Sequence, residues 1–339
     1  MFKKFDPAAY APINNACLLI LAGTALTWIL VYAKTILMPF IIAVFLSMVL
    51  NTLATWMKRK WHLPHTVGII LGVVLVLGLA ALSVLFVSNS ISSFVEGANI
   101  YADKLDATVA WFIELAQKVG LKINSEFVSD TLTKLPLFNM ARSMGSTLMS
   151  LVSNIMLVSL FLIFLFMGRA TADEKTSLAS SIEKRISYYL IIKIFVSLLA
   201  AVATWVILTA THTELAGMFA VLTFVLNFIP NIGPFIATAL PMPVLFLQYG
   251  FDWHIIAAAL LLIAAHFLIG NILETKWLGK GMDLSPIVVI ACLIFWALVW
   301  GVIGALLAVP LTCIIKIVLE RSEHTKPFAD LLAGRLIFK

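Results

Sequence analysis

The chain has 339 residues, of which 62% are hydrophobic and 12% are charged, and its formal net charge is +6. Soluble domains hold about 45–50% apolar and about 25% charged residues, so this composition excludes a soluble protein and indicates a polytopic integral membrane protein. The sequence has no basic patch with interleaved aromatic residues, so nucleic acid is not expected as a partner. The three cysteines lie in apolar segments without zinc or disulfide spacing, and neither a metal site nor a cofactor is expected.

Apolar stretches follow one another along most of the chain. Six of them are predicted to be full membrane spans, at about 13–33, 35–57, 66–90, 146–167, 190–211 and 254–274. Two longer stretches, 215–249 and 285–320, are interrupted by proline and glycine, which makes about eight hydrophobic segments in an all-α fold. Basic residues before the first span, after the second, around the fourth and fifth and in the tail predict that both termini are cytoplasmic.

The segments divide the chain into five parts. They are three N-terminal spans (1–90), an extracytoplasmic amphipathic helical segment (91–145), the fourth span with a charged cytoplasmic helix at the membrane surface (146–189), a core that holds both interrupted stretches (190–320), and a cytoplasmic tail (321–339). The outer segment carries an apolar stripe of helical period. That stripe either packs on its own chain or contacts a neighbouring subunit.

The first interrupted stretch contains "LNFIPNIGP", which begins one residue before Asn227. Pro230 cannot donate to the carbonyl four residues earlier, Pro234 repeats the defect one turn later, and Gly233 adds backbone freedom. One helix is therefore predicted to end near Asn227 and another to begin near Pro234. Unpaired backbone groups at membrane depth require surrounding protein or a water-filled cavity. The stretch is either a re-entrant hairpin with its tip here or one long kinked span.

The second interrupted stretch has a similar order of breakers. Its break is expected at Gly301 and Gly304, and Pro310 follows, as Pro241 follows the first break. Two hairpins would enter the membrane from opposite sides, which is an inverted-topology repeat of the kind that transporters use around a central site. Two hairpins would place the loop with Lys276 and Lys280 in the cytoplasm, whereas a kinked span would place it outside.

Asparagine side chains flank the first break. Asn227 and Asn231 each offer two hydrogen-bond donors and one acceptor, so they either bind a small polar solute or cap the severed helix ends. Asn271 and Glu274 share a helical face at a spacing of three residues, and Asn271 is a third candidate solute ligand.

Three charged or titratable residues lie in or near the later spans. Glu274 carries a coupling proton or cation, or pairs with Lys276 or Lys280, or is simply exposed at the membrane interface. His266 is either a hydrogen-bonded core residue or part of a proton relay. Lys193 either extends its amine to the interface or lines a pore. The sequence contains no "GxSxG", "HExxH" or paired-aspartate pattern, so an enzyme is not expected.

Two sequence stretches carry a family resemblance. "FVLNFIPNIGPFIATALP" together with "GNILETKWLGKGMDLSPIVVIACLIFWALVWGVIGALLAVPL" resembles the AI-2E family of bacterial membrane proteins. The likeness covers nearly the whole chain, although Thr275 stands where many members have proline, and Ala200 and Ala201 stand where a glycine is frequent.

The resemblance has several implications. It implies a permease in the bacterial inner membrane that exports a small polar solute, with an autoinducer-2-like signal as the first candidate. A cation/proton antiporter is the alternative within the same family. It also implies homo-oligomers, including pentamers, in contact with membrane lipid.

Overall fold

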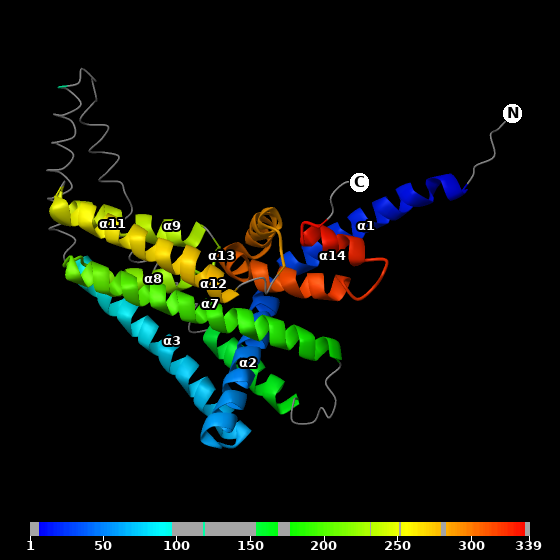
Figure 1. Ribbon diagram of the computed structural model, residues 1–339, viewed down its shortest axis with the longest axis horizontal. Helices are drawn as coiled ribbons and strands as arrows, with labels where there is room; N and C mark the ends of the chain where they lie inside the picture. Colours follow the sequence, from blue (N-terminus) through cyan, green and yellow to red (C-terminus); the bar gives the residue numbers. More distant parts are fainter. Residues whose placement is uncertain are drawn as a thin grey trace.

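The protein is described by a computed structural model in which all the secondary structure of the described residues is helical (Figure 1). The described residues are 7–96, 118, 154–168, 177–230, 232–250, 252–278 and 283–335. Most of the predicted outer segment lies outside these residues, as do Asn231 and Lys280.

Four of the described helices are long and apolar enough to cross a membrane. They are α2 (Lys34–Trp61), most of α7 (Ser177–Ala210), the run from α11 (Trp253–Phe267) through the π-helix η1 (Leu268–Glu274) to α12 (Thr275–Leu278), and α13 (Pro286–Leu319). Shorter apolar helices lie within α1 (Pro7–Tyr32), within α3 (His65–Glu96) and at 154–168. The described part of the chain has the architecture expected of a polytopic membrane protein.

The first interrupted stretch reverses its direction. The helix α8 (Ala216–Leu226) ends at Asn227, and α9 (Ile232–Ala239) and α10 (Met242–Tyr249) lead the chain back. The hydroxyl of Tyr249 donates to the carbonyl of His212 at 2.9 Å, and the N–H of Glu214 donates to Gln248 at 3.0 Å. Because both ends of the stretch lie together, this segment is a hairpin rather than a single kinked span. We call residues 214–249 the first hairpin.

The second interrupted stretch also reverses, within α13. Gly301 has φ 65° and ψ −146°, a conformation that glycine adopts readily and other residues do not. The amine of Lys316, near the end of the second arm, donates to the carbonyl of Asp283 at 2.7 Å and to its carboxylate at 2.9 Å. Asp283 immediately precedes the first arm, so this segment also folds back on itself. We call residues 283–319 the second hairpin.

The arms of both hairpins come closest at a glycine. A Cβ atom added to Gly233 would overlap the carbonyl oxygen of Leu226 and lie 2.7 Å from its carbonyl carbon. A Cβ atom added to Gly304 would meet the carbonyl group of Trp296 in the same way, again at 2.7 Å from the carbon. Each tip therefore requires a residue without a side chain at this position.

The two hairpins open towards opposite ends of α7 (Figure 1). The open end of the first hairpin lies at the C-terminal end of α7, where Tyr249 donates to the carbonyl of Thr211 at 3.2 Å. The second hairpin follows α12, which lies against the N-terminal half of α7, since the hydroxyl of Tyr188 donates to the carbonyl of Trp277 at 3.0 Å. This opposed arrangement is the one that an inverted repeat predicts.

The short C-terminal helix α14 (Lys326–Leu332) closes the open end of the second hairpin. The N–H of Ser285 donates to the carbonyl of Leu332 at 3.0 Å. Arg335 forms an ion pair with Asp283, which already accepts from Lys316. The tail beyond the last apolar helix is thus held against the hairpin by a shared carboxylate.

Two boundaries differ from those predicted. Pro310 lies inside the second arm, which stays helical through it, so Pro310 marks no hinge. Neighbouring helices bury it, and buried surroundings let an apolar helix tolerate the missing hydrogen bond. α7 runs without a break from Ser177, so this part of the charged segment before residue 190 is not a separate surface helix. The reason is that α7 contains neither proline nor glycine.

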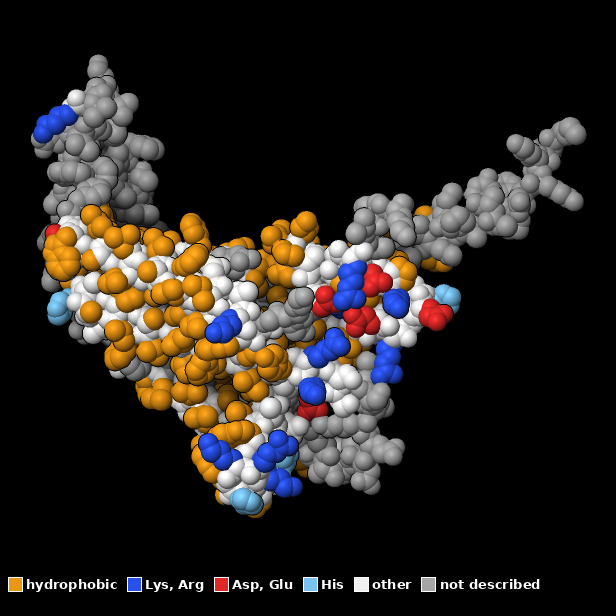
Figure 2. All heavy atoms as spheres, viewed as in Figure 1, with side chains coloured by type: hydrophobic (Ala, Val, Ile, Leu, Met, Phe, Trp, Pro, Cys, Tyr) orange, Lys and Arg blue, Asp and Glu red, His pale blue; other side chains and the backbone are white. Residues whose placement is uncertain are grey.

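The surface shows where the polar parts of the chain gather. Hydrophobic side chains cover the face over α3, α7 and α11, whereas charged side chains gather near the end of α2 and around α14 (Figure 2). The patch at the end of α2 includes Lys58, Arg59 and Lys60, which are all exposed. A broad apolar face of this kind requires a covering of lipid or of other protein.

The two tip glycines give a matched mutational test. We expect Gly233→Ala and Gly304→Ala each to lower the free energy of unfolding by about 1–3 kcal/mol, because the added methyl group collides with a helix carbonyl. Gly78→Ala is the control, since no atom lies within 4 Å of its added Cβ and alanine favours a helix. Thermal unfolding in detergent measures the difference. Equal stability of all three variants would contradict the close approach at the tips.

The contact with α14 predicts a dependence on pH. The hydrogen bond from Lys316 lowers the pKa of Asp283 in the folded protein. The ionised carboxylate of Asp283 therefore stabilises the fold fully above its pKa in the unfolded chain, about 3.9. This stabilisation is lost as pH falls through the lower pKa that Asp283 has in the folded protein. We expect Asp283→Asn to destabilise the protein at neutral pH by about 1–3 kcal/mol, because the buried amine of Lys316 loses a negatively charged partner. Melting curves from about pH 6 to about pH 3 should then show a smaller acid loss in the variant than in the parent. The exposed Glu323→Gln serves as a control, and equal acid sensitivity of parent and Asp283→Asn would reject this contact.

Candidate functional site

A half-open cavity of about 840 Å³ lies at the tip of the first hairpin. α7, the ends of α8 and α9, α11 and η1 surround it, and its wall is largely apolar. Its polar lining consists of Lys193, Asn227, Thr238, His266, Asn271, Glu274 and Thr275. Ligand sites commonly combine an apolar wall with a few placed polar groups, so this site cavity is the candidate functional site.

The strongest electrostatic feature of the site cavity is an ion pair between two helices. Lys193 of α7 donates to the carboxylate of Glu274 at the end of η1. The lysine is only 1% exposed, and the side chain of Glu274 is 16% exposed. The amine of Lys193 therefore does not reach the membrane interface, and Glu274 pairs with this lysine rather than with Lys276. A buried charge of either sign would be costly alone, so each residue requires the other.

The π-helix η1 places the acidic partner. Its turns are wider than those of an α-helix, and π-helical segments occur often at functional sites. Ile269 of η1 packs against Val196 and Ala200 of α7, which fixes the segment beside that helix. Asn271 and Glu274 consequently reach the same cavity as His266, which lies on the regular helix before them.

Asn227 immediately follows the last residue of α8, and its side chain does not cap that helix. It is 2% exposed, and its amide nitrogen donates to the hydroxyl of Ser197 on α7 at 3.0 Å. One turn earlier on α8, the hydroxyl of Thr223 is buried without a partner among the described residues. Asn227 thus ties the tip of the first hairpin to α7 while still lining the cavity.

His266 is held between two hydroxyl groups. Nε2 lies 3.2 Å from Thr204 of α7, and Nδ1 lies 2.7 Å from Thr238 of α9. The hydroxyl of Thr238 donates to the carbonyl of Pro234 at 2.9 Å, so it can only accept from the ring. Nδ1 then carries a proton, and the hydroxyl of Thr204 can serve Nε2 as donor or as acceptor. The ring links α7, α9 and α11 and also lines the cavity.

The described structure brings together most of the residues that the sequence singled out. Asn227, Asn271, Glu274 and His266 line one cavity with Pro230 and Pro234. Gly301, Gly304 and Pro310 belong to the second hairpin and lie elsewhere. Asn231 lies outside the described residues, so its role stays a prediction.

Ser197 and Thr204 of α7, which hold Asn227 and His266, were not singled out in the sequence, although Lys193 on the same helix was. Lys193, Ser197 and Thr204 lie one and then about two turns apart, on one buried side of that helix. This spacing is the signal that could have identified them. A lysine four residues before a serine in an apolar run is weak evidence alone, because serine often bonds to its own helix.

The comparison with known proteins decides the family. Residues 17–324 match the family described as AI-2E family transporter. The chain belongs to the AI-2E transporter family. The resemblance seen in the two motif stretches is thereby confirmed, as is the expectation that the protein is not an enzyme.

Several bacterial proteins are similar to this AI-2E transporter along most of its length. The AI-2 transport protein TqsA of Escherichia coli is 27% identical over 318 residues, which cover 89% of this chain and 90% of that protein. A transport protein of Haemophilus influenzae is 29% identical over 344 residues, with 96% of each chain covered. The E. coli transport protein YhhT is 28% identical over 312 residues, with 88% of each chain covered.

The Lys193–Glu274 pair of this AI-2E transporter predicts a non-additive pattern of stability. We expect Lys193→Gln or Glu274→Gln alone to destabilise the protein by about 3–5 kcal/mol, because each leaves a buried charge without its partner. The double variant should lose much less than the sum, because no buried charge remains. Melting temperatures of purified variants measure this cycle. The control is Lys276→Gln, which removes an exposed lysine, and additive losses would show that the pair does not interact.

Proposed function

We propose that this AI-2E transporter moves a small polar solute through the site cavity at the tip of the first hairpin. The observation that carries the proposal is the convergence of buried polar groups on a cavity beside a broken helix. Such a break is stable at membrane depth only beside protein or water, and a cavity with donors and acceptors uses the freed backbone groups. Similarity to an AI-2 transport protein makes an autoinducer-2-like signal the first candidate solute, and export the first candidate direction.

The polar groups of the site cavity suit a solute with several hydroxyl groups. The side-chain amide of Asn227 donates one hydrogen bond to Ser197, and its side-chain oxygen has no partner among the described residues. Lys193 uses one of its three donors on Glu274, so hydrogen-bonding capacity remains on both charged groups without breaking the pair. A neutral solute can therefore bind without uncovering a buried charge. Asn271 and the predicted ligand Asn231 would add further amides.

Glu274 is the group that we propose for coupling transport to protons. Among the described residues that line the site cavity it is the only carboxylate, and it lies beside the break. Protonation of Glu274 would release Lys193 from its partner, which links the charge state of the cavity to the contact between α7 and η1. His266 lies between two hydroxyls that join it to α7 and α9, which supports a packing role more directly than a proton relay.

The alternative function is cation/proton antiport, and one observation favours it. A buried carboxylate paired with a lysine can accept a cation in place of the ammonium group. An antiporter of this kind would exchange ions without an organic solute. The two functions therefore differ in a measurable way. Proton movement across vesicles would require the organic solute if the protein transports that solute, and would require only a cation gradient if the protein is an antiporter.

We further propose an inner-membrane protein with cytoplasmic termini that assembles as a homo-oligomer, with a pentamer as one form. The exposed basic residues at the end of α2, and Arg321, Lys326 and Arg335 in and around α14, support the orientation. The long apolar face of α1, with Ile20, Leu21 and Ile29 each more than half exposed, supports contact with lipid or with a second subunit.

Flux of autoinducer-2 in proteoliposomes tests the solute role of Asn227. We expect Asn227→Val to lower flux about tenfold, because the solute loses a hydrogen-bonding group in a buried site. Ser197→Ala is the matched variant, since it removes only the partner on α7 and should retain most of the flux. If both variants lose flux equally, Asn227 acts by holding the hairpin, and the solute role is wrong.

The same proteoliposomes distinguish the alternative. We expect Glu274→Gln, examined together with its compensating Lys193→Gln, to abolish the response of autoinducer-2 flux to an imposed pH gradient. A pH-sensitive dye inside vesicles without the solute reports antiport when a sodium gradient is applied. Sodium-driven proton movement in the parent, with no flux of autoinducer-2, would replace the solute proposal with the antiporter.

A further inference from the structure

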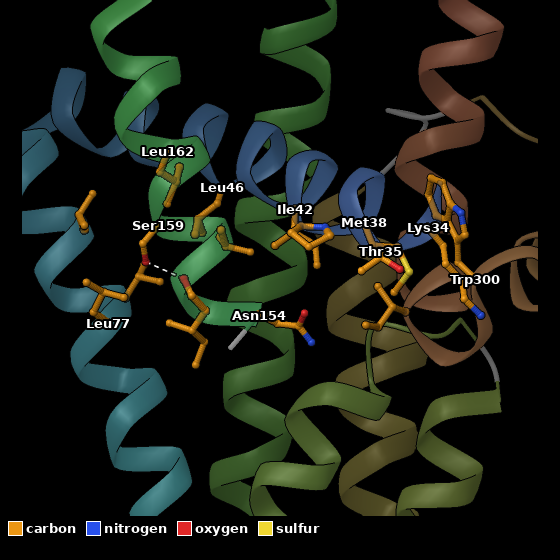
Figure 3. A pocket seen from close by; sticks show the side chains of 16 residues that line it. Lys34, Thr35, Met38, Ile42, Leu46, Leu77, Asn154, Ser159, Leu162 and Trp300 are labelled. Atoms are coloured by element: carbon orange, nitrogen blue, oxygen red, sulfur yellow. Dashed lines mark hydrogen bonds between the residues drawn. The ribbon is translucent and has the colours of Figure 1, made fainter. Parts of the chain in front are cut away.

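A second cavity, separate from the transport site, lies along one side of α2 (Figure 3). Its volume is about 480 Å³, and α2, α3, the helix at 154–168 and the tip of the second hairpin form its walls. We call it the α2 groove. None of the residues lining the site cavity lines this groove, so it is not part of the proposed transport site.

The α2 groove is polar at one end and apolar at the other. Lys34, Thr35 and Trp300 lie together at one end, and Leu46, Leu77 and Leu162 lie towards the other (Figure 3). Ser159 does not disturb the apolar end, because its hydroxyl donates to the carbonyl of Ile155 in its own helix at 2.7 Å. Apart from the exposed Asn154, which lies between the two ends, the lining changes from charged to apolar along α2, and this matches an amphiphile better than a water-soluble anion (Figure 3).

The polar end carries unused hydrogen-bonding groups. The side chain of Lys34 is exposed and has no partner among the described residues. Pro39 is buried within α2 and has no N–H for the carbonyl of Thr35. Trp300 donates its indole N–H to the carbonyl of Leu30 at 3.0 Å, so its ring is fixed as a wall of the groove. A cationic donor and a backbone acceptor are therefore available to a polar head group.

The length of α2 puts Lys34 at the level of lipid head groups. Lys34 and Lys58 lie 24 residues apart on this helix (58 − 34), which is roughly 36 Å at 1.5 Å per residue. The hydrocarbon core is about 30 Å thick, so the two lysines reach opposite surfaces. Trp28 and Tyr32, 66% and 72% exposed, stand just before Lys34 and have the character of an aromatic belt.

We propose that the α2 groove binds one bilayer phospholipid with an anionic head group, held at Lys34, and that one acyl chain lies along α2 towards Leu46. Those two residues are 12 positions apart (46 − 34), or roughly 18 Å, which is close to half the bilayer core. The inference does not depend on the transport function. It follows from the positive charge, the gradient of polarity and the depth of the groove.

Native mass spectrometry of delipidated protein with added phosphatidylglycerol or phosphatidylcholine tests the proposal. The parent should retain phosphatidylglycerol in preference to phosphatidylcholine. Lys34→Gln should weaken retention of phosphatidylglycerol about fivefold and remove the preference, because one lysine near an anionic head group is lost. The matched control is Lys58→Gln, which makes the same charge change at the other end of the helix and should behave like the parent.

A second variant tests the acyl chain. Ser159→Phe places a ring in the apolar end of the groove without removing a contact between helices, and it should lower retention of both lipids. Equal retention by the parent and Ser159→Phe would overturn the proposal. The proposal would also be overturned if Lys34→Gln still preferred phosphatidylglycerol. It would be overturned too if Ser159→Phe changed the number of subunits in the protein but not the amount of lipid retained. The last result would identify the groove as a contact between copies of the chain.

Discussion

The close approach of a glycine to a helix carbonyl is the constraint on which the rest of the structure depends. At Gly233 and again at Gly304, two helix ends meet with no room for a side chain. The reversals at these positions turn two long apolar stretches into hairpins that open towards opposite ends of α7. Unsatisfied backbone groups then lie inside the protein and away from the lipid, where they would be costly. The site cavity exists because the first of these tips stops beside α7 and α11.

The charges within the site cavity follow from the same packing. The small side chain of Ala200 lets η1 lie against α7, and the wide turns of η1 bring Glu274 to Lys193. Neither charge could remain buried without the other. The pair therefore affects both stability and ligand binding. A group that binds to Lys193 or Glu274 in place of its partner leaves the other buried charge unpaired, and must balance that charge. A neutral solute avoids this cost, whereas an ion or a proton must meet it.

Local chemistry allowed the sequence to predict where helices break but not which side chains meet. Proline and glycine act on their own backbone, so the ends of α8 and α13's first arm could be placed within a few residues. Partners of charged residues depend on packing between distant helices. For Lys193 the sequence left open the interface or a pore, and for Glu274 a lysine beside it, interface exposure or ion coupling. The local alternatives were wrong because α7 passes next to η1, eighty-one positions away in the chain.

Pro310 and α7 illustrate the same limit from the other direction. A proline in an apolar run resembles a break, yet tertiary packing around the second arm keeps the helix continuous. The charged residues at the start of α7 resemble a separate element, yet nothing in that sequence interrupts helical hydrogen bonding. Propensity alone gives the positions where a helix can stop. Packing decides whether it does.

The neutrality of the Lys193–Glu274 pair has an electrical consequence. Moving one elementary charge through the membrane potential involves about 2.3 kcal/mol per 100 mV. A cavity that contains one positive and one negative side chain contributes almost no net charge to such a movement. If the cavity opens to each side of the membrane in turn, as the proposed function requires, this step would depend little on the membrane potential when no solute is bound. Any voltage dependence of the transport cycle would come from the charge of the transported solute or of a proton that moves with it.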